Sequence, residues 1–82
     1  MEVTAEIRSW KEHTNSHGSY FTGTIWNDSK GRWKDGTSFH TSQVVQKLTV
    51  NNDIYVVTLN STYACKAEHK RKPQGPVLVQ AR

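Results

Sequence analysis

The sequence predicts an all-β domain, a small SH3-like or OB-like barrel of about five to seven short antiparallel strands. Apolar and polar residues alternate along residues 3–8, which is typical of a half-buried strand. Short runs of β-branched and aromatic residues then recur at intervals of roughly 8 to 12 residues, separated by Asn, Asp and Gly. Since no segment has the length and caps of a long helix, a closed or nearly closed barrel suits a chain of 82 residues.

The first two strands are predicted over residues 2–10 and 19–27. The segment between them, residues 11–18, is polar throughout and ends in Gly18, so we expect a loop there. Gly23 interrupts the second strand, which is rich in aromatic residues. A glycine inside a strand indicates a bulge or a sharp bend, such as the corner of a barrel.

Turn-forming residues divide the middle of the chain. Residues 27–31 have the composition of a type I turn and lead into a brief third strand at 32–34. Asp35-Gly36 is a strong hairpin signal, so a fourth strand is expected over residues 37–41. A single helical turn at Thr41-Ser42 is then predicted before a fifth strand at residues 44–50.

Two further strands are predicted at residues 54–59 and 62–67, after turns at 51–53 and 60–61. Residues 69–76 are charged and then rich in Pro and Gly, and they cannot form an interior strand because Pro73 and Pro76 lack an N–H donor. Val77-Leu78-Val79 is compatible with a short edge strand that returns to the first strand. Such a return would hold the preceding basic run as a loop rather than a tail.

Charge separates this single domain, residues 1–82, into a neutral body at 1–65 and a basic segment at 66–82. Six cations and six acids cancel in the body, whereas the segment has five cations against Glu68 alone, which accounts for the net charge of +4. A basic run indicates an anionic partner such as DNA or RNA, or else a solvated loop that keeps a small protein soluble.

The single cysteine and the absence of targeting signals favour a cytoplasmic location. Cys65 is the only cysteine, so no intramolecular disulfide can form. The first twenty residues lack the pattern of a signal peptide, and no apolar run is long enough to span a membrane. We therefore expect a cytoplasmic protein that does not insert into membranes.

The residues that could support catalysis or metal binding are better explained by structure. His13 and His17 are four apart, but their segment has no apolar stripe to hold a helix and no third ligand nearby in sequence. The aspartates of the body fall in expected turns, and alternation places His40 and Thr41 on opposite faces of a strand. We expect a protein that is not an enzyme and that needs no cofactor or metal.

A partner-binding surface is predicted from cations and one aromatic residue. Trp33 stands between Arg32 and Lys34, a combination suited to stacking a base while neutralising phosphate, although strand alternation would instead turn Trp33 inward. Together with the basic segment these residues make the candidate nucleic-acid-binding set. Its members are Arg32, Trp33, Lys34, Lys66, Lys70, Arg71 and Lys72.

Residues 31–44 and 58–63 resemble sequences of small, β-rich, uncharacterised proteins of bacteriophages and prophages, and the resemblance covers about residues 20–63. It implies a shared small β fold and a phage-type accessory role in the cytoplasm of a host cell, but it assigns no catalytic residue. Three functions follow as expectations. They are nucleic-acid binding, inhibition of a host or defence protein by protein–protein binding, and sequestration of a nucleotide by a homo-oligomer.

Overall fold

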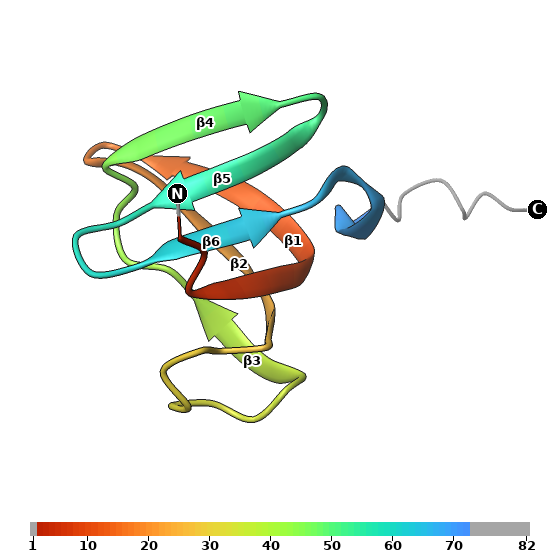
Figure 1. Ribbon diagram of the computed structural model, residues 1–82. Helices are drawn as coiled ribbons and strands as arrows, with labels where there is room; N and C mark the ends of the chain where they lie inside the picture. The colour runs from red at the N-terminus through yellow and green to blue at the C-terminus, as the bar shows by residue number, and fades with distance from the viewer. Residues whose placement is uncertain (1, 73–82) are drawn as a thin grey trace, which may run out of the picture.

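The computed structural model describes residues 2–72, which form one six-stranded sheet with the order β3-β2-β1-β6-β5-β4 (Figure 1). The strands are β1 (Ala5–Asn15), β2 (Gly18–Trp26), β3 (Thr37–His40), β4 (Gln46–Val50), β5 (Asp53–Val57) and β6 (Thr62–Cys65). One short 3-10 turn, η1 (Ala67–His69), follows β6, and the described residues contain no α-helix. The prediction of an all-β fold is confirmed.

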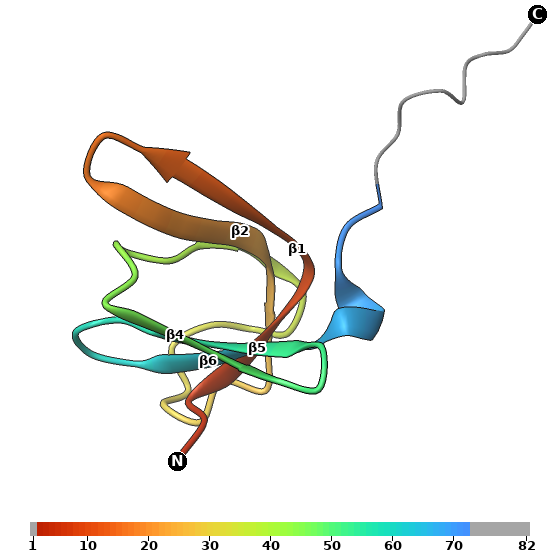
Figure 2. The ribbon, with the colours of Figure 1, turned by 90° about the horizontal axis from the view of Figure 1, so that it is seen from above.

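A bulge in β1 bends the sheet. The pairing of β1 with β2 shifts between Arg8 and Lys11, and Ser9 takes a left-handed φ of 53°. Gly23 lies opposite the bulge, where a Cβ atom would stand 2.5 Å from the carbonyl oxygen of Arg8 and 2.7 Å from Ile7 Cγ2. Only glycine permits this close approach of the two strands. The predicted bend at Gly23 is therefore present. In Figure 2, β1 and β2 bend and part of this strand pair runs away from β4, β5 and β6.

The chain between β3 and β4 bridges the two sides of this bent sheet. The amides of Thr41 and Val44 donate to the carbonyl oxygens of Phe21 and Ser19 in β2, and the amide of Val45 donates to Val57 in β5. On the other side, β1 pairs with β6 in parallel, whereas all the other strand pairs are antiparallel. The result is a small barrel-like fold with one parallel pairing that the sequence did not predict.

The core fills the inside of the bend with side chains from β1, β2, β5 and β6. Phe21, Ile7, Ile25, Val56 and Cys65 are completely or almost completely buried. Trp10 joins this cluster and packs against Phe21 with 5.7 Å between the ring centroids. Few but large side chains thus supply most of the apolar burial in a small domain.

The predicted loop at residues 11–18 is wrong, because β1 continues to Asn15 and turns only at residues 16–17. The continuation is polar since both of its faces are outside the core. Its side chains instead contact residues of β2, the adjacent strand, and of β4. His13 stacks on Tyr20 at 5.0 Å and hydrogen-bonds Thr22, and Glu12 forms an ion pair with Lys47 of β4. Cross-strand pairs of this kind stabilise a strand without an apolar stripe.

The predicted third strand at residues 32–34 is also wrong, since residues 27–36 form a loop between β2 and β3. The predicted helical turn at Thr41 and Ser42 is absent, because the Thr41 amide and hydroxyl both bond to Phe21 of β2 instead. The strands predicted at 37–41, 44–50, 54–59 and 62–67 are present but shorter. The predicted return strand at residues 77–79 lies outside the described residues.

Candidate functional site

The basic segment leaves the end of β6 and is anchored to β1 at Trp10. The indole Nε1 of Trp10 donates a hydrogen bond to the carbonyl oxygen of Lys66 at 2.8 Å, and the Trp10 carbonyl oxygen accepts one from the amide of Arg71 at 2.8 Å. Lys70 pairs with Trp10 as an isolated parallel bridge and places its Nζ 5.7 Å from the indole centroid. Residues 66–71 are therefore held against the bulge of β1 (Figure 1).

A stacked pair, Arg8 and Trp26, lies on the outer face beside this anchor. The guanidinium carbon of Arg8 is 4.5 Å from the centroid of the Trp26 indole, a cation–π distance. Both side chains are fixed by further bonds. Arg8 donates to Glu6 Oε1 at 3.2 and 3.3 Å, and Trp26 Nε1 donates to Thr24 Oγ1 at 3.0 Å. The pair is a preorganised flat surface at the outside of the sheet.

A groove of about 480 Å³ lies between the stacked pair and the basic segment. Arg8, Thr24 and Trp26 line one side, and residues 68–72 line the other. Lys70, Arg71 and Lys72 are exposed, and no ion pair to them occurs among residues 2–72. A larger open hollow of about 1260 Å³ adjoins the groove, lined by Trp10 and Lys11 and by the same Lys70, Arg71 and Lys72. Cations thus concentrate around the groove.

Glu6 is the acid nearest to the stacked pair, and its charge is already compensated. Burial opposes its ionisation, but hydrogen bonds from Asn27 and Arg8 and the positive charges of Arg8 and Lys66 lower the pKa of Glu6 below its usual value. Glu6 is thus a carboxylate at neutral pH, and it orients Arg8 over Trp26.

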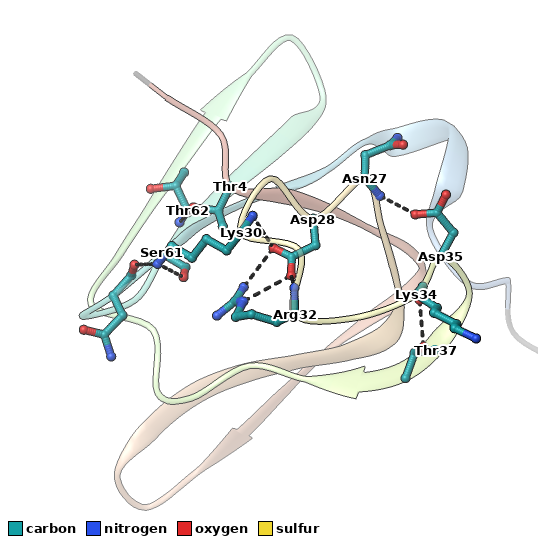
Figure 3. A network of polar contacts seen from close by, with 11 residues as sticks. Thr4, Asn27, Asp28, Lys30, Arg32, Lys34, Asp35, Thr37, Ser61 and Thr62 are labelled. Atoms are coloured by element: carbon teal, nitrogen blue, oxygen red, sulfur yellow. Dashed lines mark hydrogen bonds and ion pairs between the residues drawn. The ribbon is translucent and has the colours of Figure 1, made fainter.

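The loop of residues 27–36 is organised by the carboxylate of Asp28 (Figure 3). Asp28 accepts hydrogen bonds from the Arg32 amide at 2.8 Å, from Arg32 Nε and Nη2 at 3.1 Å each, and from the Lys30 amide at 3.3 Å. These bonds from Arg32 outweigh desolvation and lower the pKa of Asp28 to about 2. The same bonds raise the pKa of Arg32, to which the Tyr63 side chain also contributes. The charge of Arg32 is therefore compensated by Asp28 within the loop.

Trp33 and Lys34 extend from the same loop. Trp33 is 46% exposed and lies edge-on to Phe39 with 5.9 Å between the ring centroids. Because residue 33 is not in a strand, the alternation that would have turned its side chain inward does not apply. Lys34 bonds to Thr37 through its carbonyl oxygen, and its side chain points outward (Figure 3).

The seven predicted residues are not brought together as one surface. Lys30 bonds Asn60 and Ser61 just before β6, and the ring of Phe39 that contacts Trp33 also packs on Tyr63, near the start of β6. Lys66, Lys70, Arg71 and Lys72 follow the end of that strand. Arg32 and Trp33 therefore lie at one end of β6 and the basic segment at the other.

Sequence reasoning missed Arg8, Trp10, Lys11 and Trp26 as members of the candidate site. Arg8 and Lys11 lie in the neutral body, where six cations are cancelled by six acids, and of the three tryptophans only Trp33 stands between two cations in the sequence. Only Trp10 is a core residue. The alternation of residues 3–8 places Arg8 on the polar face, but the position of the basic segment beside it depends on the tertiary fold.

Other reactive side chains have structural explanations. Among residues 2–72 no three His, Cys, Asp or Glu side chains cluster in a way that could hold a metal ion. His13 is engaged by Tyr20 and Thr22, whereas His17 is in the hairpin turn. Cys65 is buried, and burial together with the charge of Glu12 raises the pKa of its thiol to about 12. A buried thiol with a raised pKa is a structural rather than a reactive cysteine.

Comparisons with known proteins give no relative. The chain matches no protein-family model, no curated protein and no solved structure. Within the described part of the chain, no helix has the length and apolar character needed to cross a bilayer.

Proposed function

We propose that this protein is a non-enzymatic accessory protein that binds nucleic acid in the groove between the Arg8–Trp26 pair and residues 68–72. The role is that of a phage-type cytoplasmic protein. Phosphates contact Lys70, Arg71 and Lys72, while the flat surface of the stacked pair faces the bases. Arg32 and Trp33 lie outside this interface.

One observation supports the proposal most strongly: three consecutive exposed cations without an ion-pair partner in residues 2–72 are fixed beside a preorganised aromatic surface. A basic run that only keeps the protein soluble would not have to be held at one place on the fold. Here the Arg71 amide and the Lys66 carbonyl are both bonded to Trp10, so the backbone that carries Lys70 and Arg71 is anchored close to Arg8 and Trp26. Cations around an aromatic surface are the usual elements of a nucleic-acid groove.

A salt titration tests the proposal. Binding to a fluorescent oligonucleotide is followed by anisotropy between about 50 and 200 mM salt, where neutralising about four phosphates gives a log–log slope near −3 for a single strand and near −3.5 for a duplex. Replacing Lys70, Arg71 and Lys72 with Ala should weaken binding and reduce the slope by about 2. As a matched control, Lys30, Lys34 and Lys47 are replaced with Ala, which gives the same net charge. Absence of binding at low salt, or an equal loss in the control, contradicts the proposal.

A second candidate function is inhibition of a host or defence protein. It is favoured by exposed apolar side chains near the end of β5, where Leu59 is 87% and Val45 is 61% exposed. Val45 precedes β4, which among residues 2–72 pairs with β5 alone and lies at an edge of the sheet. An exposed edge next to apolar side chains can accept a strand from another protein. A partner that is recovered after nuclease treatment, and lost on Val45→Lys substitution, would support this function over the first.

A further inference from the structure

We infer that the groove is selective for single-stranded nucleic acid, with one unpaired base stacked on the Arg8–Trp26 pair. This inference rests on the proposed function and adds the class of ligand. It begins from the chemistry of the pair. An indole and a guanidinium are both planar, and both stack on nucleobases.

The geometry of the pair is suited to a base rather than to a phosphate alone. Arg8 approaches Trp26 through its planar guanidinium and is anchored by Glu6, so the carboxylate already occupies part of its hydrogen-bonding capacity. Its side chain is 33% exposed. A planar group with a compensated charge offers stacking surface more than net positive potential.

The uncompensated charge lies on the opposite wall of the groove. Lys70, Arg71 and Lys72 supply three cations there against one acid, Glu68, whose carboxylate lies 3.2 Å from His69 Nε2, so this wall keeps a net positive charge. A strand that passes through the groove therefore meets phosphate-binding cations on one side and a stacking surface on the other. In a duplex the bases are already stacked and paired, so only the cations would be engaged.

The two walls are held in place by the bulge of β1. Ser9, with its left-handed φ, separates outward-facing Arg8 from Trp10, whose carbonyl oxygen receives the Arg71 amide. Thr24 spans the same region, donating from its hydroxyl to the Arg8 carbonyl oxygen at 3.2 Å while accepting from Trp26 Nε1. Stacking surface and cations are therefore preorganised relative to each other, which lowers the entropic cost of binding.

The experiment compares an oligothymidine of about 12 nucleotides, within the site sizes of small β-barrels, with a duplex of the same length at low salt. The variants are Trp26→Leu and Arg8→Lys, and the control is Trp33→Leu, which removes an exposed tryptophan at the other end of β6. We expect Trp26→Leu to weaken single-strand binding by roughly tenfold or more and to leave duplex binding nearly unchanged. Arg8→Lys keeps the charge and removes the planar group, so it should act in the same direction without threatening the fold.

The outcomes separate this inference from the proposed function. If the wild-type protein binds neither ligand, both fail. If it binds single strand and duplex equally and Trp26→Leu and Arg8→Lys change nothing, the groove is a phosphate site and the inference alone is overturned. If Trp33→Leu weakened single-strand binding more than Arg8→Lys, the stacking surface would lie in the loop of residues 27–36 and not in the groove. This result would also overturn the inference. Thermal denaturation of each variant identifies any loss caused by unfolding.

Discussion

Replacing Asp28 with Asn should destabilise the protein in a manner that depends on pH. Asn retains one oxygen but presents an NH₂ group where Asp28 accepts bonds from Arg32. A pKa lowered from 3.8 to about 2 corresponds to at most about 2.5 kcal/mol of stabilisation at neutral pH. Because Arg32 is 35% exposed and solvent screens the pair, we expect about 1 to 2 kcal/mol.

The sign of the pH dependence follows from the direction of the shift. A carboxyl group whose pKa is lower in the folded state stabilises the fold above its unfolded pKa. This contribution disappears as the pH falls from about 4 to about 2. The difference in unfolding free energy between the wild type and Asp28→Asn, measured by urea denaturation, should therefore be largest near neutral pH, fall as the pH drops below about 4, and approach zero only at about pH 2 and below.

A matched control in the same loop isolates the effect. Asp35 accepts one hydrogen bond through Oδ1, from the Asn27 amide at 2.7 Å, and Asn at position 35 can retain that oxygen. Asp35→Asn removes the same charge and should cost clearly less than Asp28→Asn. The reasoning would be refuted by equal losses in the two variants, or by a difference for Asp28→Asn that is constant with pH.

Three further predictions concern the bend, the anchor and the buried thiol. Gly23→Ala should destabilise the protein by about 1 to 3 kcal/mol in urea denaturation, since a Cβ atom meets backbone at 2.5 Å; unchanged stability would contradict the assigned bend. Trp10→Phe removes the indole donor to Lys66, so limited trypsin cleavage after Lys70 or Arg71 should accelerate while the melting curve stays cooperative. Equal cleavage rates in wild type and variant would show that Trp10 does not hold the segment. Cys65, whose thiol pKa is raised to about 12 by burial and then by Glu12, should react with iodoacetamide at pH 8 only after denaturation; labelling of the native protein at the denatured rate would disprove its burial.

Much of the fold could be predicted from the sequence because its local signals agree. Alternation identified the first half of β1, the aromatic run identified β2, and Gly23 identified the bend opposite Ser9. The second half of β1 escaped because it has no apolar periodicity and is stabilised by cross-strand partners such as Lys47, which is 35 residues away from Glu12. The parallel pairing of β1 with β6 likewise has no local signature.

The candidate site was only half predictable for a similar reason. The basic segment is visible as a charge run, but the partner that fixes it, Trp10, is identified only by hydrogen bonds across 56 residues of sequence. The sequence suggested that Arg32, beside Trp33, could bind a phosphate. In the structure its guanidinium forms an ion pair with Asp28, four residues earlier. Charge counts treat every cation alike, whereas hydrogen-bond geometry separates those that are engaged from those that remain free to bind a ligand.

The indole signals of the three tryptophans report whether the ligand occupies the groove between the Arg8–Trp26 pair and the basic segment. Each indole N–H gives one signal in a ¹⁵N-correlated NMR spectrum, and Trp→Phe variants assign the three. On addition of the oligothymidine, we predict the largest chemical-shift change for the indole N–H of Trp26 in the groove. The change should be smaller for Trp10, which anchors the basic segment, and almost absent for Trp33. A shift confined to Trp33, or none at Trp26 under saturating ligand, would contradict this prediction.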